Sequence, residues 1–502
     1  MARPLLHDLL DRTAERTPDA PAIGHGPRAL TYGEVRAVSR RIAGHLAARG
    51  VGRGDRVVVA LNPDVAIPPL LYGCSRAGAV FAVIQHGAPD VVVAHVLDDC
   101  EPRLVVSDAP AARRLAAERG IACWDLDQLR AAADDGTAAP PADPRAPASL
   151  TVDPVCFIYT SGSTGMPKAV VSTHDQVTFA VSAIQSQLEY RPDDVVFCAL
   201  PLSFDYGLYQ LFVSTLAGAR LQLGSDADAG HRILVRLSEA RATVLPAVPP
   251  LARNLARLLS RPGATRPPLR LITNTGAAMP PSVMAVVRAG LPGVQVQLMF
   301  GLTECKRATI MPKDEDLRRP GACGRALPGT EVFVIGERGE RLPAGQIGEI
   351  VVRGPNVMAG YWRRPELTAQ RFHRAEGLFP ELRTGDYGRL DGDGYLYFEG
   401  RRDDIYKERG YRVSVAEVEA AAHRVPGVDA AAVLPPGHGH DGAILLVVAQ
   451  LGPPEVLARL RQQLEEPKIP SRCMVVERLP VNGNGKVDRA RLARIAEGDG
   501  RG

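Results

Sequence analysis

Tyr159-Thr160-Ser161-Gly162-Ser163-Thr164-Gly165-Met166-Pro167-Lys168-Ala169-Val170 is the stretch that says most about this chain. It follows the apolar run 155–159, which is typical of a buried strand, so this segment leaves a strand end as a loop. Gly162 and Gly165 allow the backbone to bend tightly around a ligand. Backbone N–H groups of such a loop bind phosphate oxygens, joined here by the hydroxyls of Thr160, Ser161, Ser163 and Thr164 and the ammonium of Lys168.

The loop differs from the Walker phosphate loop, which reads Gly-x-x-x-x-Gly-Lys-Ser/Thr. A Ser/Thr/Gly-rich surface turn is an alternative, but the length and order of the run and its Pro-Lys end argue against it. The run resembles the signature loop of the adenylate-forming superfamily, which includes acyl-CoA synthetases, luciferases and the adenylation domains of peptide synthetases. The resemblance extends over residues 30–489 and implies an enzyme that uses ATP and Mg²⁺ to form an acyl-adenylate from a carboxylic acid.

Bulk composition argues against several other classes of protein. A chain of 502 residues implies about two to four domains. Its 60 basic and 56 acidic residues give a formal charge of +4, which provides no case for nucleic-acid binding. The eight cysteines form no C-x-x-C pair, which argues against a zinc ribbon, a redox dithiol and a disulfide framework. The sequence has no stretch typical of a membrane span or a signal peptide, so we expect a cytoplasmic enzyme without a membrane partner.

Lysine is rare in this chain, because only six of the 60 basic residues are lysines. The compact ammonium and the planar guanidinium perform different tasks, so each lysine in an arginine-rich chain needs a specific reason. Four of the six lie within or beside the motifs that carry the resemblance. They are Lys168, Lys306, Lys407 and Lys486.

The order of elements predicts an α/β fold. Residues 31–49 read as an N-capped amphipathic helix, and strands then alternate with helices, which predicts parallel sheets flanked by helices. A small β-rich subdomain is expected at about 330–400, where short strands alternate with turns. We therefore expect a large N-terminal adenylation core at 1–402 and a small mobile α+β C-terminal domain at 403–502.

Two segments are expected to hold the nucleotide and its metal. In Phe300-Gly301-Leu302-Thr303-Glu304 the resemblance implies that Phe300 faces adenine, Thr303 binds the α-phosphate and Glu304 binds Mg²⁺ through a hard oxygen ligand. A Thr-Glu helix cap is the alternative for the last two residues. Gly276-Ala277-Ala278 resembles the loop against which adenine packs.

Two further motifs are expected to bind the ribose of the nucleotide and to form a hinge. Arg383-Thr384-Gly385-Asp386 resembles the segment in which Asp386 accepts hydrogen bonds from the ribose hydroxyls, although a Gly-Asp turn between strands is equally common. In the run 400–412 the resemblance places Arg401 on ribose or phosphate and makes Asp403 the hinge. The alternative is a solvated charge run.

Leu479-Pro480-Val481-Asn482-Gly483-Asn484-Gly485-Lys486 resembles the catalytic-lysine loop of the same superfamily. The resemblance implies that Lys486 bridges the substrate carboxylate and the α-phosphate. An Asn-Gly turn with an exposed lysine is the alternative, and the scarcity of lysine argues against it.

The segment from Leu200 to Phe212 resembles the entrance to the acid pocket. In adenylation domains that use amino acids, the residue matching Asp205 pairs with the substrate amino group. A helix-cap aspartate is the alternative, and some fatty-acid enzymes carry a similar Phe-Asp-Tyr-Gly. The same resemblance places Tyr206, Tyr209, Ala247, Thr273, Thr275, Met299, Arg307 and Ala308 on the pocket walls.

Cys305-Lys306-Arg307 departs from the family pattern, which has small or apolar residues here. Adjacent cations are costly to bury without an anionic partner. A second carboxylate on the substrate would provide one, which indicates an acidic or β-amino acid such as an aspartate derivative. Phosphate, Glu304 and solvent remain alternative partners for Lys306 and Arg307.

The thiol acceptor is open at the level of sequence. A stand-alone enzyme that loads the phosphopantetheine thiol of a separate carrier protein, in a natural-product pathway, is one hypothesis. An acyl-CoA synthetase that acts on a non-amino acid and uses CoA is the second. A non-catalytic nucleotide-binding relative is disfavoured by the complete motif set.

Overall fold

The computed structural model describes residues 4–135, 149–161, 166–225, 227–374, 380–401, 405–408, 411–436, 442–464, 468–482 and 486–498. Several of the residues singled out by sequence lie outside these ranges or have undescribed side chains. Gly162, Ser163, Thr164, Gly165 and Asp403 lie outside the described residues, and Ser161 and Arg401 are described by their backbone alone.

Two large sheets form the N-terminal part of the molecule. The seven-stranded sheet has the order β18 (Gly360–Tyr361), β8 (Pro167–Thr173), β7 (Pro154–Ser161), β4 (Val80–Val83), β3 (Arg56–Ala60), β5 (Leu104–Ser107) and β6 (Ala122–Trp124). The nine-stranded sheet has the order β15 (Arg325–Ala326), β14 (Thr309–Ile310), β13 (Gln295–Phe300), β12 (Leu271–Asn274), β11 (Val244–Ala247), β9 (Val195–Cys198), β10 (Arg220–Leu223), β1 (Pro21–His25) and β2 (Arg28–Thr31). Strands β4 to β6 and β13 to β1 pair in parallel, as the alternation of elements predicts.

Helices cover both faces of each sheet. The largest apolar core lies between the sheets and is built on α1 (Leu6–Arg16), α2 (Tyr32–Ala48), α3 (Ile67–Ala77), α7 (His174–Leu188) and α8 (Asp205–Ala217). The outer face of the nine-stranded sheet carries α9 (Ile233–Glu239), α10 (Pro249–Leu259) and α11 (Pro281–Gly290). The outer face of the seven-stranded sheet carries α4 (Asp90–Cys100) and α5 (Pro110–Glu118), and α6 (Leu126–Asp134) packs on the edge of the first core.

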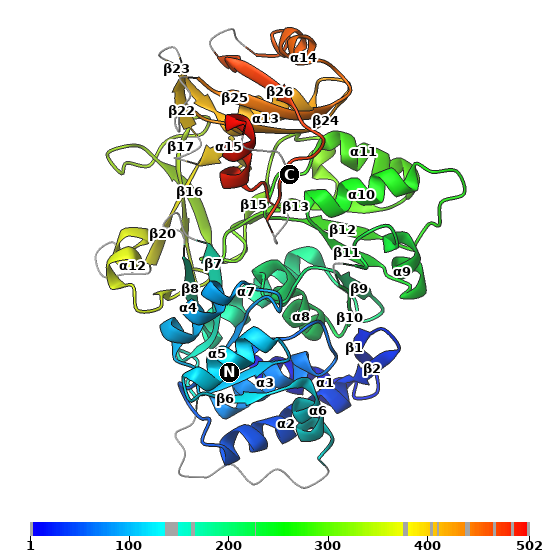
Figure 1. Ribbon diagram of the computed structural model, residues 1–502, viewed down its shortest axis with the longest axis vertical. Coiled ribbons are helices and arrows are strands. Elements are labelled where there is room, and N and C mark those ends of the chain that lie inside the picture. The colour runs from blue at the N-terminus through cyan, green and yellow to red at the C-terminus, as the bar shows by residue number, and fades with distance from the viewer. Residues whose placement is uncertain are drawn as a thin grey trace.

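The β-rich subdomain expected at 330–400 is an antiparallel sheet. Its strands are β16 (Glu331–Ile335), β17 (Gly348–Arg353), β20 (Pro380–Leu390), β19 (Phe372–Arg374) and β21 (Leu396–Arg401), with α12 (Pro365–Arg371) beside them. The C-terminal α+β unit contains β22 (Ile405–Glu408), β23 (Tyr411–Ser414), α13 (Val415–His423), β24 (Val428–Leu434), β25 (Ile444–Ala449), α14 (Pro453–Leu460), β26 (Arg472–Val475) and α15 (Arg489–Glu497). Figure 1 shows this unit, in orange and red, at the opposite end of the molecule from α1 to α6.

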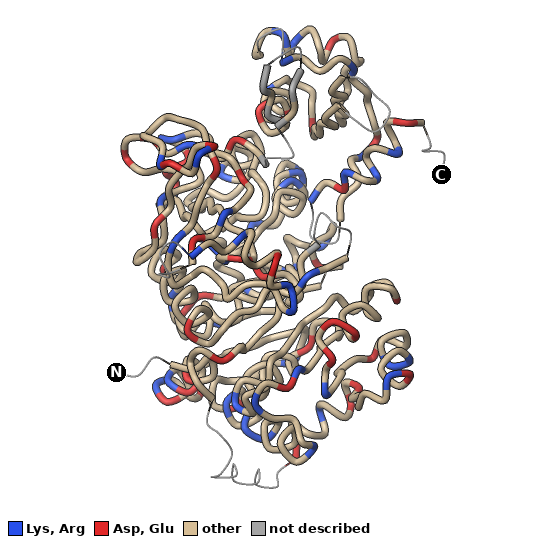
Figure 2. The backbone as a smooth tube through the Cα atoms, turned by 90° about the vertical axis from the view of Figure 1, so that its left-hand side faces the viewer, with Lys and Arg blue, Asp and Glu red and all other residues tan. Residues whose placement is uncertain are grey.

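Charged side chains are distributed over the whole molecule. Figure 2 shows basic and acidic positions intermixed along the tube, in agreement with the nearly balanced composition. No described helix combines the length and the apolar character needed to cross a membrane.

The N-terminal helix is attached to the core through a neutral histidine, which makes its docking sensitive to acid. The backbone N–H of Leu6 donates to Nδ1 of His174 at 3.0 Å, and the His174 side chain is buried. Burial, followed by the charge of His7, lowers the pKa of His174 from its ordinary value of 6.5 to about 4, against opposing effects of Asp153 and Asp8. The unfolded chain therefore binds more protons than the folded chain between these two pH values.

We expect the free energy of unfolding to fall by about 3 kcal/mol as the pH drops from 6.5 to 4 through His174 alone. The measurement is the melting temperature as a function of pH. His174→Asn retains an acceptor oxygen near the position of Nδ1 and has no titrating ring, so its melting temperature should decline less steeply over this window. Parallel profiles for the two proteins would contradict the assignment.

Candidate active site

Several of the predicted site residues lie in loops at the carboxyl edge of the nine-stranded sheet. Parallel strands expose the loops that follow them at a single edge, where ligands of α/β proteins bind. After β9 the chain runs into Phe204 and Asp205, after β12 into 275–278, and after β13 into 301–307. The start of β8 carries Lys168, whose ammonium lies over the ring of Tyr361, and the Tyr361 hydroxyl contacts Glu304 in the loop after β13.

The phosphate-loop motif connects two antiparallel strands. Thr160 pairs with Lys168 across β7 and β8, so both ends of the motif lie side by side. The Oγ1 atom of Thr160 is buried without a described hydrogen-bond partner, so it is available to bind a ligand. Lys168 Nζ lies 4.1 Å from the ring centroid of Tyr361, which holds the ammonium over an aromatic face.

Glu304 is a buried carboxylate suited to a cation. The Tyr361 hydroxyl donates to Glu304 Oε1 at 2.6 Å, and Glu304 forms no ion pair with any described lysine or arginine. A buried carboxylate that forms no ion pair is costly, so a divalent ion would be stabilised here. Among the described residues no group of three or more His, Cys, Asp or Glu side chains gathers around one point. A Mg²⁺ ion at Glu304 would therefore take its other ligands from nucleotide phosphates and water.

The helix cap considered for Thr303 and Glu304 is not present, because these residues lie in a turn between β13 and β14. Phe300 is the last residue of β13, and its ring centroid lies 5.7 Å from that of Phe398 on β21. Ala277 and Ala278 are exposed in the loop after β12, where they are accessible to a ligand.

The expected ribose segment is a bulge inside β20. The register against β17 shifts between Glu349 and Val351, opposite residues 383–387, and Gly385 adopts a φ of +68°. A Gly-Asp turn between two strands is therefore not what this motif forms. The bulge buries Asp386, which pairs with Arg401 in β21 through the backbone.

Lys486 reaches the rest of the predicted site from the C-terminal unit. A β-carbon placed on Gly276 would lie 4.0 Å from Cε of Lys486 and 3.6 Å from Cζ of Phe204. The loop that carries the lysine is closed by two hydrogen bonds, from Asn482 N to Lys486 O at 2.7 Å and from Lys486 N to Asn482 Oδ1 at 3.1 Å. The side chain itself remains exposed to solvent.

Asp205 and Arg307, both predicted to lie at the acid pocket, form an ion pair with each other. Arg307 Nη1 lies 3.2 Å from Asp205 Oδ2, and both side chains are less than a tenth exposed. The guanidinium carbon lies 4.8 Å from the ring centroid of Tyr206. Asp205 is the first residue of α8 and forms no capping hydrogen bond, so the helix-cap alternative does not hold. Solvent as the partner of Arg307 is likewise wrong, because its partner is a protein carboxylate.

Lys306 is fully buried and has a left-handed backbone conformation with a φ of +62°. Its Nζ atom has no hydrogen-bond partner among the described residues and lies 5.4 Å from the ring centroid of Tyr209. Burial lowers the pKa of Lys306 below its ordinary value, partly opposed by Cys156, Asp205 and Glu304. A buried lysine amine without a hydrogen-bond partner is a candidate for contact with an anionic ligand.

The other predicted pocket residues lie nearby. The hydroxyls of Tyr209 and Thr275 are buried without a described partner, Tyr206 Oη and Thr273 Oγ1 are 2.6 Å apart, and Ala247, Met299 and Ala308 are buried.

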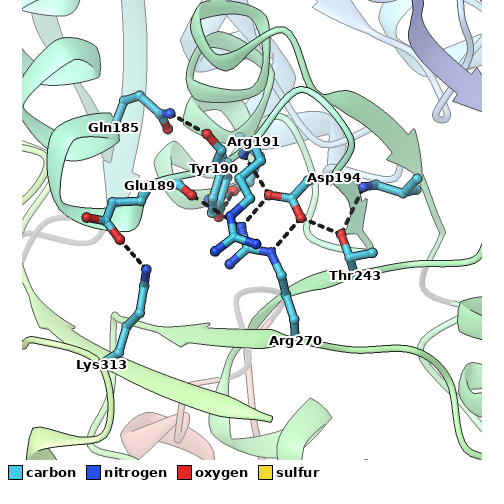
Figure 3. Close-up of polar contacts among 10 residues, drawn as sticks. Gln185, Glu189, Tyr190, Arg191, Asp194, Thr243, Arg270 and Lys313 are labelled. Carbon is cyan, nitrogen blue, oxygen red and sulfur yellow. Dashed lines mark hydrogen bonds and ion pairs between the residues drawn. The ribbon is translucent and has the colours of Figure 1, made fainter. Parts of the chain in front are cut away.

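A polar network that the sequence did not indicate reaches the backbone carbonyl of Tyr206. Tyr190 donates to Gln210 Oε1 at 2.9 Å, and Gln210 Nε2 donates to Tyr206 O at 3.1 Å. Figure 3 shows how Asp194 accepts hydrogen bonds from Arg270 and Thr243 near Tyr190. Single tyrosines and glutamines carry no recognisable spacing, so only the folded structure identifies this support.

Two family models match the chain. The model described as AMP-binding enzyme matches residues 10–362, and the model described as AMP-binding enzyme C-terminal domain matches residues 417–486. Among curated proteins, feruloyl-CoA synthase from an Amycolatopsis species is 33% identical over 495 residues, covering 96% of this chain and 97% of that protein. Tyrocidine synthase 2 from Brevibacillus parabrevis is 27% identical over 98% of this chain and 14% of its own length.

Solved structures also resemble this chain over most of its length. VinN is 40% identical with a TM-score of 0.73, covering 80% of this chain and 100% of that chain, and it has also been solved in complex with L-aspartate. ATP-bound MatB from Rhodopseudomonas palustris is 31% identical with a TM-score of 0.86, covering 99% of this chain and 100% of that chain.

Proposed function

The chain belongs to the AMP-binding enzyme family, and we propose that it activates the side-chain carboxylate of an acidic amino acid and transfers the acyl group to a separate carrier protein. Activation of an acid by adenylation follows from the family itself, so the chain is an AMP-forming ligase. The acid and the acceptor are the proposed parts. We also infer a division at residue 402 into an adenylation core and a C-terminal unit that rotates about Asp403 between two half-reactions.

The observation that carries the proposal is the buried pair of Asp205 and Arg307. Their opposite charges lie 3.2 Å apart, a separation comparable to that of the ammonium and carboxylate groups on the α-carbon of an amino acid. An α-amino acid head could therefore bind with its ammonium on Asp205 and its carboxylate on Arg307. Lys306, whose Nζ has no hydrogen-bond partner among the described residues, would add a second cation for that carboxylate.

This placement leaves a different carboxylate to react. With the α-carboxylate held by cations, the side-chain carboxylate of an aspartate-like acid is the group that can extend toward Lys486 and the phosphate loop. The structure of VinN in complex with L-aspartate is 39% identical in sequence to this chain, which agrees with an acid of this class.

The residues of the site supply positioning and charge for the reaction. A carboxylate oxygen of the acid attacks the α-phosphorus of ATP, the bond to the bridging oxygen breaks, and pyrophosphate leaves with the electron pair. Lys486 and Lys168 would offset the negative charge, and Thr303 would hold the α-phosphate. When bound at Glu304, Mg²⁺ would neutralise phosphate charge. No general base is needed, because the acid is ionised at neutral pH.

Pyrophosphate exchange with three related acids tests the substrate. L-Aspartate should support exchange. Succinate, which lacks the amino group, and β-alanine, which lacks the α-carboxylate, should each support it less well than L-aspartate. Arg307→Met should raise KM for L-aspartate by about tenfold or more, because a charged contact is lost. It should affect KM for β-alanine less, because β-alanine has no α-carboxylate and only the loss of the ion-pair partner of Asp205 acts on it. An equal change for both acids would contradict the role of Arg307 in binding the α-carboxylate.

An acyl-CoA synthetase is the second candidate, because feruloyl-CoA synthase matches this chain over nearly its whole length. Ferulate and free CoA discriminate between the candidates. Exchange with ferulate and formation of its CoA thioester, without exchange on L-aspartate, would replace the amino-acid proposal.

A further inference from the structure

Tyr361 lies between two groups of the candidate site that belong to different parts of the chain. Its hydroxyl donates to Glu304 Oε1 at 2.6 Å, and its ring lies 4.1 Å below the Lys168 ammonium. The side chain is only 5% exposed. One residue thus contacts both the expected Mg²⁺ ligand and the lysine at the end of the phosphate loop.

The backbone around Tyr361 fixes this position from both sides. Met358 N donates to Glu304 O at 2.8 Å, which ties the segment to the loop after β13. Ala359 N donates to Val171 O and Trp362 N donates to Ala169 O, both at 3.0 Å, which ties it to β8 directly after Lys168. These hydrogen bonds connect the segment that contains β18 both to β8 of its own sheet and to the loop that follows β13 of the nine-stranded sheet.

A third connection leads from Tyr361 to the expected ribose segment. The Arg371 guanidinium lies near the phenol and donates from Nη2 to Thr384 O at 2.6 Å, in the bulge that precedes Asp386. The ring of Phe372 packs edge-on against Tyr361, with the centroids 5.4 Å apart. The phenol is therefore held by packing as well as by its polar contacts.

We propose that Tyr361 is a positioning residue that aligns the Glu304 carboxylate with the Lys168 ammonium and thereby assembles the site for the Mg²⁺–triphosphate. A phenol is protonated at neutral pH, so it donates to the carboxylate and orients it. With Oε1 engaged by the hydroxyl, Oε2 receives no hydrogen bond from any described residue. That oxygen can face a cation, while the ring keeps Lys168 at a fixed distance from it.

This inference rests on the nucleotide chemistry of the family and is independent of which acid is activated. Its consequences therefore appear in the binding of ATP, before any acid or thiol acceptor is involved. The proposal can fail while the amino-acid assignment holds, and the reverse is also possible.

The test is titration calorimetry of the full-length protein with ATP at a series of Mg²⁺ concentrations. Tyr361→Phe keeps the ring under Lys168 and removes the hydroxyl. The Mg²⁺ concentration at which Mg²⁺ produces half of its effect on ATP affinity should rise about tenfold, as expected for the loss of a hydrogen bond to a charged group. Affinity for ATP without Mg²⁺ should change less than twofold. Tyr361→Leu also removes the aromatic face and should weaken ATP binding in the absence of Mg²⁺ as well.

Tyr32→Phe is the matched control. It removes a buried tyrosine hydroxyl that donates to Ser214 O and Ala219 O at 3.1 and 2.7 Å, on α2 in the core between the sheets. Its Mg²⁺ dependence should equal that of the wild-type protein. A Tyr361→Phe protein with a wild-type melting temperature and an unchanged Mg²⁺ dependence would overturn the proposal, and so would a Mg²⁺ shift of the same size in the control.

Discussion

Lys486→Ala is expected to reduce acid-dependent ATP–pyrophosphate exchange by about 10²–10³-fold, the range seen when one donor that stabilises transition-state charge is removed. The lysine extends from the C-terminal unit to within contact distance of the Gly276 position, which lies in the loop at the carboxyl edge of the sheet. Negative charge develops on the α-phosphate and the departing pyrophosphate in the transition state. An ammonium close to these groups therefore stabilises the transition state more than the ground state.

The same variant should fold normally. Lys486 is exposed, so its replacement should change the free energy of unfolding by less than about 0.5 kcal/mol. Lys468→Ala is the matched control, because Lys468 lies in the same unit and pairs with Glu417 at 2.8 Å. Exchange rates that agree between Lys486→Ala and Lys468→Ala would contradict the catalytic assignment of Lys486.

Asp205→Asn should affect both stability and activity. Two cations, Lys306 and Arg307, are buried at this position, and the carboxylate is the ion-pair partner of the second. Removing one partner of a buried pair costs about 3–5 kcal/mol, because the remaining charge stays buried without compensation. The loss of the carboxylate should also reduce exchange with amino acids by about 100-fold, through the missing contact to the ammonium.

A double variant separates these two effects. Asp205→Asn combined with Arg307→Met removes both charges, so denaturant unfolding should show recovery of stability relative to Asp205→Asn. Exchange with L-aspartate should remain low, because neither charge of the amino-acid head has a partner. Recovery of exchange together with stability would show that Asp205 serves the fold alone.

Local motifs allowed much of the fold and of the nucleotide site to be predicted from sequence. The capped helix at 31–49 forms as α2, where Thr31 and Glu34 exchange capping hydrogen bonds, because capping depends on neighbouring residues. The phosphate-loop motif and Glu304 are likewise recognisable from adjacent residues. The structure places Glu304 in the loop after β13 and links it through Tyr361 to Lys168 at the end of the motif, whereas their chemical roles remain predictions.

Long-range partners could not be predicted in this way. Asp205 and Arg307 are 102 positions apart, so the sequence showed that the cation needed an anion without showing that the protein itself supplies one. Tyr361 was missed for a similar reason, since its partners lie at 168 and 304 and a single tyrosine carries no spacing signal. Such contacts are determined by tertiary packing.

The central claim is that the Asp205–Arg307 pair holds the amino-acid head and presents the side-chain carboxylate for activation. Hydroxylamine trapping tests it directly, because the nitrogen attacks the acyl carbon of the adenylate, releases AMP and leaves a stable hydroxamate. The enzyme is incubated with ATP, Mg²⁺ and L-aspartate, and the product is identified by chromatography against both hydroxamate standards. The account predicts aspartate β-hydroxamate, and formation of the α-hydroxamate would contradict it.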